Sequence, residues 1–211
     1  MTGNVVDATA EQQPVLVLMG VSGCGKSTVA AVLAGQLGWD QEEGDDLHPA
    51  GNVSKMAAGT ALTDEDRWPW LDLVAGWIHN HTVAGIPGIV TCSALKKVYR
   101  DRLRGDNVVF VHLAGSKEQI GQRLAARTDH FMPVALLDSQ VATLESLGPD
   151  ENSLVVDFGR KPADVAAEII ASLSLVPESG SSVLGSDHPG RSSAPPLADL
   201  WTGDAQHHQP A

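Results

Sequence analysis

The residues whose types and spacing most clearly point to chemistry form a glycine-rich string. Residues 20–27 read GVSGCGKS and fit the pattern G-x-x-x-x-G-K-[ST]. Its glycines permit positive φ angles, so backbone amides can approach a phosphate with no Cβ between them. Lys26 would add a positive charge near the β- and γ-phosphates, and the Ser27 hydroxyl is a candidate Mg²⁺ ligand. The string therefore predicts a nucleoside triphosphate site. The predicted nucleotide contacts are Gly20, Val21, Ser22, Gly23, Cys24, Gly25, Lys26, Ser27 and Thr28.

The segments that flank this string are the ones that a phosphate-binding loop requires. Residues 15–19 (VLVLM) form a short apolar run typical of a buried strand, and residues 28–37 have helical spacing. The amides at the start of that helix would point at the same anion as the loop. A turn that only connects a strand to a helix is the alternative. Four fixed positions with both flanks in place make that alternative the weaker interpretation.

Strands and helices alternate along the rest of the chain. We expect further strands at 39–43, 86–92, 107–113 and 153–157, and further helices at 49–58, 63–83, 93–103, 116–126, 133–147 and 162–173. This alternation predicts an α/β fold, with a mostly parallel sheet covered by helices on both faces. We expect residues 1–13 to be a flexible lead-in and 14–175 to form one domain. Residues 176–211 are rich in Ser, Gly and Pro, which predicts a disordered tail.

Composition narrows the classes of function. The net charge of -12 disfavours broad electrostatic binding to nucleic acid or to an anionic membrane. No apolar run approaches the length of a membrane span, and residues 1–13 lack the features of a signal peptide. The two cysteines, Cys24 and Cys92, show no zinc-site spacing and are not expected to pair, which suits a cytoplasmic protein.

The cations are concentrated rather than spread evenly. Ten of the fourteen Lys and Arg residues fall in a few short segments: Lys26, Lys55, Arg67, Lys96, Lys97, Arg100, Arg102, Arg104, Arg123 and Arg127. In an acidic protein, this placement indicates a local site for small anions. Ordinary surface scatter is the alternative, and it stays open for Arg102 and Arg104.

Several ordered motifs resemble one family. They are GDDLHP at 44–49, Asn52, KM at 55–56, LTDEDR at 62–67, PWL at 69–71, CSALKKVYR at 92–100 and HFMP at 130–133. Across residues 14–172 the chain resembles the gluconokinases, in the branch of P-loop kinases that includes nucleoside monophosphate kinases and shikimate kinase. The resemblance implies the P-loop kinase fold with a five-stranded parallel core. It also implies ATP, Mg²⁺ and phosphoryl transfer to the 6-hydroxyl of D-gluconate, and it suggests a homodimer. The chain departs from the family pattern at Asp129 and in the segment after 175.

On this basis, cations can be assigned to the donor and the acceptor. Arg123 and Arg127 lie four residues apart, on one face of an expected helix, and could close over the ATP phosphates. The alternative is that both arginines are solvated side chains on a helix face. This alternative is weaker for Arg127 than for Arg123. A carboxylate acceptor favours arginine in bidentate geometry, which makes Arg67 and Arg100 candidates, supported by Lys96. The resemblance adds Lys55 and His130 to the predicted acceptor contacts.

Carboxylates and amides are expected to recognise the acceptor hydroxyls. Asp45 follows an expected strand, where α/β proteins place their ligands, so it is the candidate general base or hydroxyl-orienting group. His48 and Asn52 are further candidates, although His48 could be only a turn residue. For Asp64 and Asp66 we prefer helix capping. Mg²⁺ could rest on Ser27, the phosphates and water, with Asp45 behind.

Two other functions remain open at this stage. The first is a P-loop kinase of another small acceptor, such as a different sugar acid, a shikimate-like compound or a nucleotide. Aromatics make up only 4% of the chain, so a base-stacking pocket for a nucleotide acceptor is disfavoured. The second is a nucleotide-binding regulator without metabolic chemistry.

Overall fold

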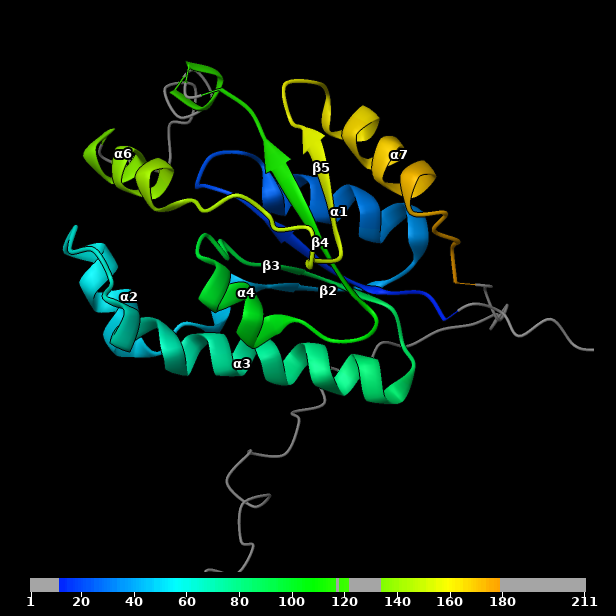
Figure 1. The fold of residues 1–211 in the computed structure, drawn as a ribbon, viewed down its shortest axis with the longest axis horizontal. Helices are drawn as coiled ribbons and strands as arrows, with labels where there is room; N and C mark the ends of the chain where they lie inside the picture. Colours follow the sequence, from blue (N-terminus) through cyan, green and yellow to red (C-terminus); the bar gives the residue numbers. More distant parts are fainter. Residues whose placement is uncertain (1–11, 117, 122–133, 179–211) are drawn as a thin grey trace, which may run out of the picture. The chain divides into compact units, whose positions relative to one another are not determined.

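The computed structural model describes residues 12–116, 118–121 and 134–178 (Figure 1). Of residues 134–136 only the backbone is described. These described residues belong to one compact unit. Arg123, Arg127, Asp129 and His130, together with residues 179–211 of the expected tail, lie outside the described residues.

A five-stranded sheet forms the centre of the described unit. Its strands are β1 (Val15–Met19), β2 (Asp40–Glu43), β3 (Gly88–Thr91), β4 (Val108–Ala114) and β5 (Ser153–Asp157). They are arranged in the order β2-β3-β1-β4-β5, and every neighbouring pair is parallel. The predicted five-stranded parallel sheet is confirmed. All the strands end at the same edge, so the segments that follow them meet there.

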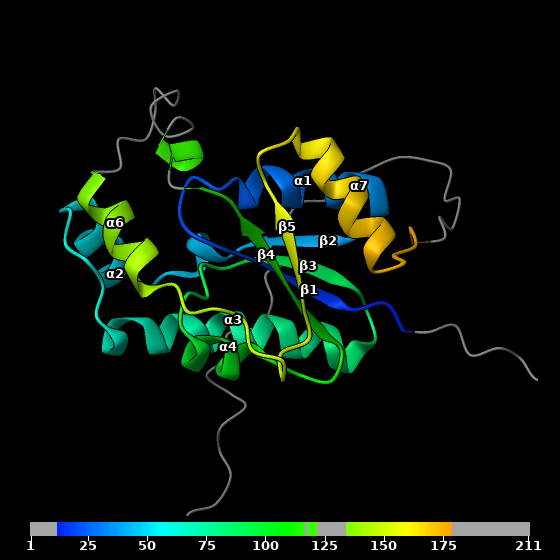
Figure 2. The same cartoon turned by 45° about the horizontal axis from the view of Figure 1, so that its top comes forward.

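Helices cover both faces of the sheet, as Figures 1 and 2 show. Two helices, α1 (Lys26–Leu37) and α7 (Pro162–Ser172), pack on one face through Leu33 and Ile169. On the opposite face, α3 (Asp64–Ala84) and α4 (Lys97–Leu103) pack through Trp70 and Leu103. The remaining described elements are the 3-10 helix η1 (Gly44–Leu47), α2 (Ala50–Ala57) and α6 (Val134–Thr143). Burial on both faces explains why β1 consists entirely of apolar residues; β3 is also buried throughout, although it ends in Thr91.

Two helix starts differ in a way that matters for the site. A capping box begins α3: Thr63 accepts a hydrogen bond from the Asp66 amide, and Asp66 accepts one from the Thr63 amide. The capping role that we preferred for Asp66 is therefore confirmed. By contrast, α1 follows Gly25 with no side-chain cap and no acidic residue in its first turn. Its first amides are left for a ligand.

Two expected helix boundaries are wrong. The helix expected from residue 93 begins at Lys97, because Ala94 takes a positive φ of 44° and interrupts it. The helix expected to run to 147 ends at Thr143, and the amide of Glu145 instead donates to the Leu95 carbonyl at 2.8 Å.

The ordered chain also extends past the boundary expected at 175. The amides of Val176 and Glu178 donate to Gln13 Oε1 at 3.1 Å and to the Leu37 carbonyl at 2.8 Å. Within the described ranges, no helix combines the length and the apolar character needed to cross a bilayer.

Candidate active site

The phosphate loop connects β1 to α1 with the backbone that its glycines predict. Gly20, Gly23 and Gly25 have φ angles of 136°, 84° and 101°. A Cβ on Gly20 would stand 3.0 Å from the Leu113 carbonyl oxygen, so both conformation and space require glycine there. The ammonium of Lys26 folds back to donate to the carbonyls of Gly20 at 3.1 Å and Val21 at 3.3 Å. The loop, the uncapped α1 amides and Lys26 together form a cradle suited to a phosphate.

The Ser27 and Thr28 side chains are exposed at the start of α1. The part of the chain that the structure describes contains no group of three His, Cys, Asp or Glu residues able to hold a metal ion. A hydroxyl such as that of Ser27 is a suitable oxygen donor for Mg²⁺, which commonly binds with only one or two protein ligands and completes its shell with phosphate oxygens and water. The residues present therefore fit a Mg²⁺ ion that arrives with the nucleotide.

Asp45 lies directly after the end of β2, in a turn that is fixed to β3. Gly44 packs so closely on β3 that a Cβ would stand 2.0 Å from the Thr91 carbonyl oxygen, which makes glycine obligatory. The amide of Gly44 donates to Thr91 Oγ1 at 3.1 Å, and its carbonyl accepts from Trp70 Nε1 at 2.6 Å. These bonds fix the start of η1, and the Asp45 side chain is exposed directly after them. Sequence reasoning missed Thr91, which anchors this turn.

Three charged residues from different elements converge around the end of β3. Burial raises the pKa of the Cys92 thiol to about 12, and the charges of Lys26, Asp45 and Arg67 also act on it. Lys26 follows β1, Asp45 follows β2 and Arg67 lies in α3. Hydrogen bonds attach their segments to the same edge. The Gly20 amide of the phosphate loop donates to the Ser93 carbonyl at 3.3 Å, and the Gly44 amide donates to Thr91 Oγ1. Trp70, three residues after Arg67, donates to the Gly44 carbonyl and so brings the start of α3 there. The structure thus brings the predicted donor lysine, carboxylate and acceptor cation together.

His48 and Asn52 form a connected pair at the start of α2. The His48 ring stacks on Trp70 with centroids 4.2 Å apart. Burial and the charge of Arg67 lower the pKa of His48, while the charge of Asp45 opposes them. The lowered pKa favours the neutral ring. Asn52 Nδ2 lies 3.3 Å from His48 Nδ1 and donates to the Asp66 carbonyl at 2.7 Å. Since the amide nitrogen can only donate, neutral His48 carries its proton on Nε2 and can offer it to a ligand.

The two predicted lysines are paired with the carboxylates at the start of α3. Lys55 Nζ lies 2.6 Å from Asp66 Oδ1, and Lys96 Nζ lies 2.7 Å from Asp64 Oδ2. The Tyr99 hydroxyl also donates to Asp64 at 2.5 Å. The hydrogen bonds from Lys96 and Tyr99 lower the pKa of Asp64, so this carboxylate stays ionised. We preferred helix capping for Asp64, but the capping box is formed by Thr63 and Asp66. Asp64 instead forms an ion pair with Lys96 and accepts a hydrogen bond from Tyr99.

Arg67 and Arg100 were predicted to share one role, and the structure separates them. Arg67 is half-buried, its guanidinium lies 5.8 Å from the Tyr99 ring centroid, and it makes one long hydrogen bond, 3.4 Å, to the Leu62 carbonyl. Among the described residues it has no other hydrogen-bond partner, so most of its donors remain available to a ligand.

Arg100 is fully buried, and the structure argues against its predicted role in acceptor binding. Its Nε and Nη2 donate to the two Glu151 oxygens at 2.5 and 3.1 Å. The other donors reach backbone carbonyls at 3.1–3.2 Å, which belong to Ala94, Leu95, Glu145 and Ser146. All five N–H groups are used, so no donor is left for an acceptor. This network holds the left-handed Ala94 turn after β3.

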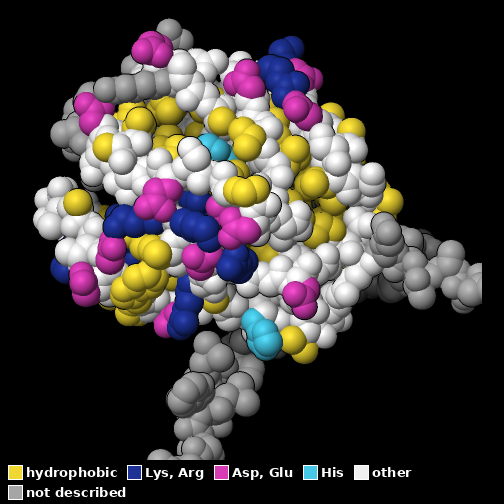
Figure 3. Space-filling model, in the orientation of Figure 1, with side chains coloured by type: hydrophobic (Ala, Val, Ile, Leu, Met, Phe, Trp, Pro, Cys, Tyr) yellow, Lys and Arg dark blue, Asp and Glu magenta, His cyan; other side chains and the backbone are white. Residues whose placement is uncertain are grey.

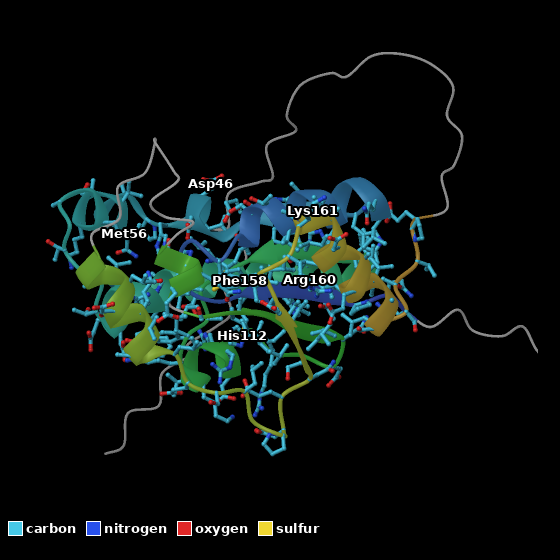
Figure 4. The ribbon with its side chains drawn as sticks, turned by 90° about the horizontal axis from the view of Figure 1, so that it is seen from above. Asp46, Met56, His112, Phe158, Arg160 and Lys161 are labelled. Carbon is cyan, nitrogen blue, oxygen red and sulfur yellow. The ribbon has the colours of Figure 1, made fainter. Side chains whose placement is uncertain are left out.

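Other Lys and Arg residues lie outside the group of candidate site residues. Arg102 pairs with Asp72 at 2.7 Å, and Arg104 approaches Asp101 and Asp150, so scatter into surface ion pairs is the correct interpretation for both. Lys, Arg, Asp and Glu side chains are intermixed over α3 and α4 in Figure 3. Arg160 and Lys161 follow β5, next to Phe158, at the same edge as the phosphate loop but on the side away from Asp46 and Met56 (Figure 4). Sequence reasoning did not single them out.

The fold and the site together define a P-loop kinase: a parallel sheet with a phosphate loop after its central strand β1, and a group of polar and charged side chains at the same edge after β2 and β3. Residues 4–75 match the family model described as ABC transporter, a match that spans the phosphate loop but only about a third of the chain. The chain is 50% identical over 157 residues to a gluconokinase of Gluconobacter oxydans, covering 74% of this chain and 88% of that protein.

Two solved structures agree with this relationship. A sugar kinase from Janibacter has a TM-score of 0.73 at 44% identity, covering 78% of this chain and 96% of the other. A gluconokinase from Sinorhizobium meliloti has a TM-score of 0.71 at 40% identity, covering 78% and 94%. The chain belongs to the gluconokinase family.

Proposed function

We propose that this protein transfers the γ-phosphoryl group of ATP to the 6-hydroxyl of D-gluconate, giving 6-phospho-D-gluconate and ADP. The observation that carries the proposal is the attachment of three segments around the end of β3. The phosphate loop attaches through Gly20 and Ser93, the turn before Asp45 through Gly44 and Thr91, and α3 through Trp70 and Gly44. In this proposal the phosphate donor binds near the Asp45 carboxylate and near Arg67, most of whose N–H donors have no partner among the described residues. The names of the relatives supply the identity of the acceptor.

On the donor side, binding depends on the backbone. Phosphoryl transfer needs positioning and charge neutralisation more than covalent help. The loop amides and Lys26 hold the ATP phosphates, and Lys26 exchanges its carbonyl partners for phosphate oxygens. Ser27 would hold Mg²⁺, which neutralises charge on the phosphates when bound. In the same proposal Arg123 and Arg127 contribute further positive charge at the donor.

On the acceptor side, Arg67 binds the gluconate carboxylate, and the paired Lys96 lies nearby. His48 and Asn52 recognise hydroxyl groups, while Lys55 and His130 complete the proposed contacts. Asp45 accepts a hydrogen bond from the attacking hydroxyl and takes its proton as the new O–P bond forms. The 14–175 domain carries all of these residues, and we further propose that it acts as a cytoplasmic homodimer.

The test is ADP release from the full chain with ATP, Mg²⁺ and a panel of acceptors. Gluconate-dependent release, with much weaker release for other sugar acids, shikimate and nucleoside monophosphates, is the expected result. Release that favours another acceptor would reassign the substrate. ADP release independent of any acceptor, or nucleotide binding without release, would favour a nucleotide-binding regulator.

A further inference from the structure

A contact between α6 and the phosphate loop has no place in the scheme above. Gln140 Oε1 accepts a hydrogen bond from the Ser22 amide at 2.7 Å, across 118 residues of sequence. The Ser22 N–H needs an acceptor, so the oxygen of the Gln140 amide must face the loop. Gln140 is half-buried and lies in the described part of α6.

Two backbone hydrogen bonds also restrain the first half of the phosphate loop: the Gly20 amide donates to the Ser93 carbonyl and the Cys24 amide donates to the Val21 carbonyl, both at 3.3 Å. This half of the loop lies between β1 and α1 and so takes part in neither the sheet ladder nor the helical hydrogen bonds. Lys26 holds the Gly20 and Val21 carbonyls from one side, and Gln140 holds the Ser22 amide from the other. When ATP draws Lys26 away, the Gln140 contact remains alongside these two backbone bonds and holds the Ser22 amide.

The base of α6 is firmly attached to the protein core. Leu144 packs against the hydrophobic clusters on both faces of the sheet. The Glu145 amide donates to the Leu95 carbonyl, and buried Arg100 donates to the carbonyls of Glu145 and Ser146. Arg100 also forms the buried ion pair with Glu151. The C-terminal end of the helix that carries Gln140 is therefore fixed.

We propose that Gln140 is a positioning residue for the ATP site. Through its hydrogen bond to the Ser22 amide, Gln140 of α6 holds the phosphate loop in the shape that receives the ATP phosphates. Arg100 fixes the residues that follow the C-terminal end of α6. Arg100, predicted from sequence to bind the acceptor, thus acts on the donor side. This inference rests on the proposed function only in taking ATP as the ligand of the loop.

The test compares Gln140→Ala and Gln140→Leu with wild type and with Ser139→Ala, a control at the adjacent exposed position of α6. Gln140→Leu keeps most of the side-chain volume but removes the acceptor. The affinity of a non-hydrolysable ATP analogue is measured by calorimetry with Mg²⁺ and no gluconate. Hydrogen exchange of the Ser22 amide is followed by NMR in the ligand-free protein, and the KM values for ATP and gluconate are measured separately.

Both Gln140 variants should bind the analogue about threefold to tenfold more weakly, the loss expected for one hydrogen bond. In both variants the Ser22 amide should exchange faster by a similar factor and the ATP KM should rise, while the gluconate KM stays within about twofold of wild type. In Ser139→Ala the analogue affinity and both KM values should stay within about twofold of wild type. Analogue affinity unchanged in both variants would overturn the proposal, as would a joint rise of both KM values. Weaker analogue binding with unchanged Ser22 exchange would mean that Gln140 contacts the nucleotide directly, which also overturns it. Calorimetry without gluconate stays informative even if gluconate is not the substrate.

Discussion

The donor side of the site consists mainly of backbone groups, whereas the acceptor side consists of side chains. On the proposed donor side, the groups offered to the ligand are backbone amides of the phosphate loop and of α1, and Gly20, Gly23 and Gly25 fix their geometry. On the proposed acceptor side, the groups offered are side chains from η1, α2 and α3, and several already pair with one another, as Lys55 does with Asp66. A backbone site is set by a short local string, whereas a side-chain site depends on which partner each side chain finds in the fold.

The largest expected effect is on the donor side. Lys26→Ala removes the only side-chain charge within the loop, and the ATP phosphates lose their main cationic partner. We expect turnover to fall by at least about 100-fold, the loss typical of removing one preorganised electrostatic contact. The measurement is steady-state ADP release together with circular dichroism. Substantial activity in a folded Lys26→Ala variant would contradict the assignment of the donor side.

The next effect concerns the acceptor side. Asp45→Asn keeps the size of the side chain but removes the charge and most of the basicity. We expect kcat to fall by roughly 10²–10⁴-fold if Asp45 is the general base, and by less if a loose transition state needs little deprotonation. The affinity for ATP should stay near wild type.

A magnesium titration of Asp45→Asn distinguishes two roles for this carboxylate. Added Mg²⁺ should rescue a defect in holding metal-bound water but not the loss of a base. Turnover within about threefold of wild type at saturating Mg²⁺, far below the general-base range, would exclude Asp45 as the catalytic carboxylate. Asp46, the next residue in η1, would then be tested.

Arg100→Ala should act on stability rather than on acceptor binding. It leaves Glu151 buried without its partner, which typically costs about 3–5 kcal/mol. Arg102→Ala is the matched control on the same helix, because its exposed pair with Asp72 should contribute only about 0–1 kcal/mol. Urea unfolding of the two variants measures the difference. A stable Arg100→Ala protein with a raised gluconate KM would restore the acceptor role of Arg100 and contradict its role in holding the buried network around Glu151.

The same ion pair predicts a pH dependence with a definite sign. The hydrogen bond from Arg100 lowers the pKa of Glu151 below its usual 4.5. The folded state therefore binds this proton less readily than the unfolded state does. The stabilisation is complete above about pH 4.5 and is lost as the pH falls through the lower folded-state pKa. In Glu151→Gln this contribution should be absent, and urea unfolding below pH 4.5 compared with pH 7 checks it.

The difference between the two sides also explains what the sequence could predict. The phosphate loop and the parallel sheet were predictable because local strings and periodicity determine them. The role of Arg100 was not, because it depends on Glu151, 51 residues away. One signal was present: Arg100 lies three residues before Leu103 and so shares the buried face of α4. Gln140 offered no such signal, since a single glutamine on an amphipathic helix usually faces solvent.

The most direct test of this two-sided account is the gluconate KM of Arg67→Ala, measured beside its ATP KM. Arg67 is the predicted acceptor cation with donors still available, and losing a charge-assisted hydrogen bond to a carboxylate should cost roughly 1.5–3 kcal/mol. The account predicts a rise in the gluconate KM of about tenfold or more, with the ATP KM and the melting temperature near wild type. An unchanged gluconate KM, or equal rises in both KM values, would contradict it.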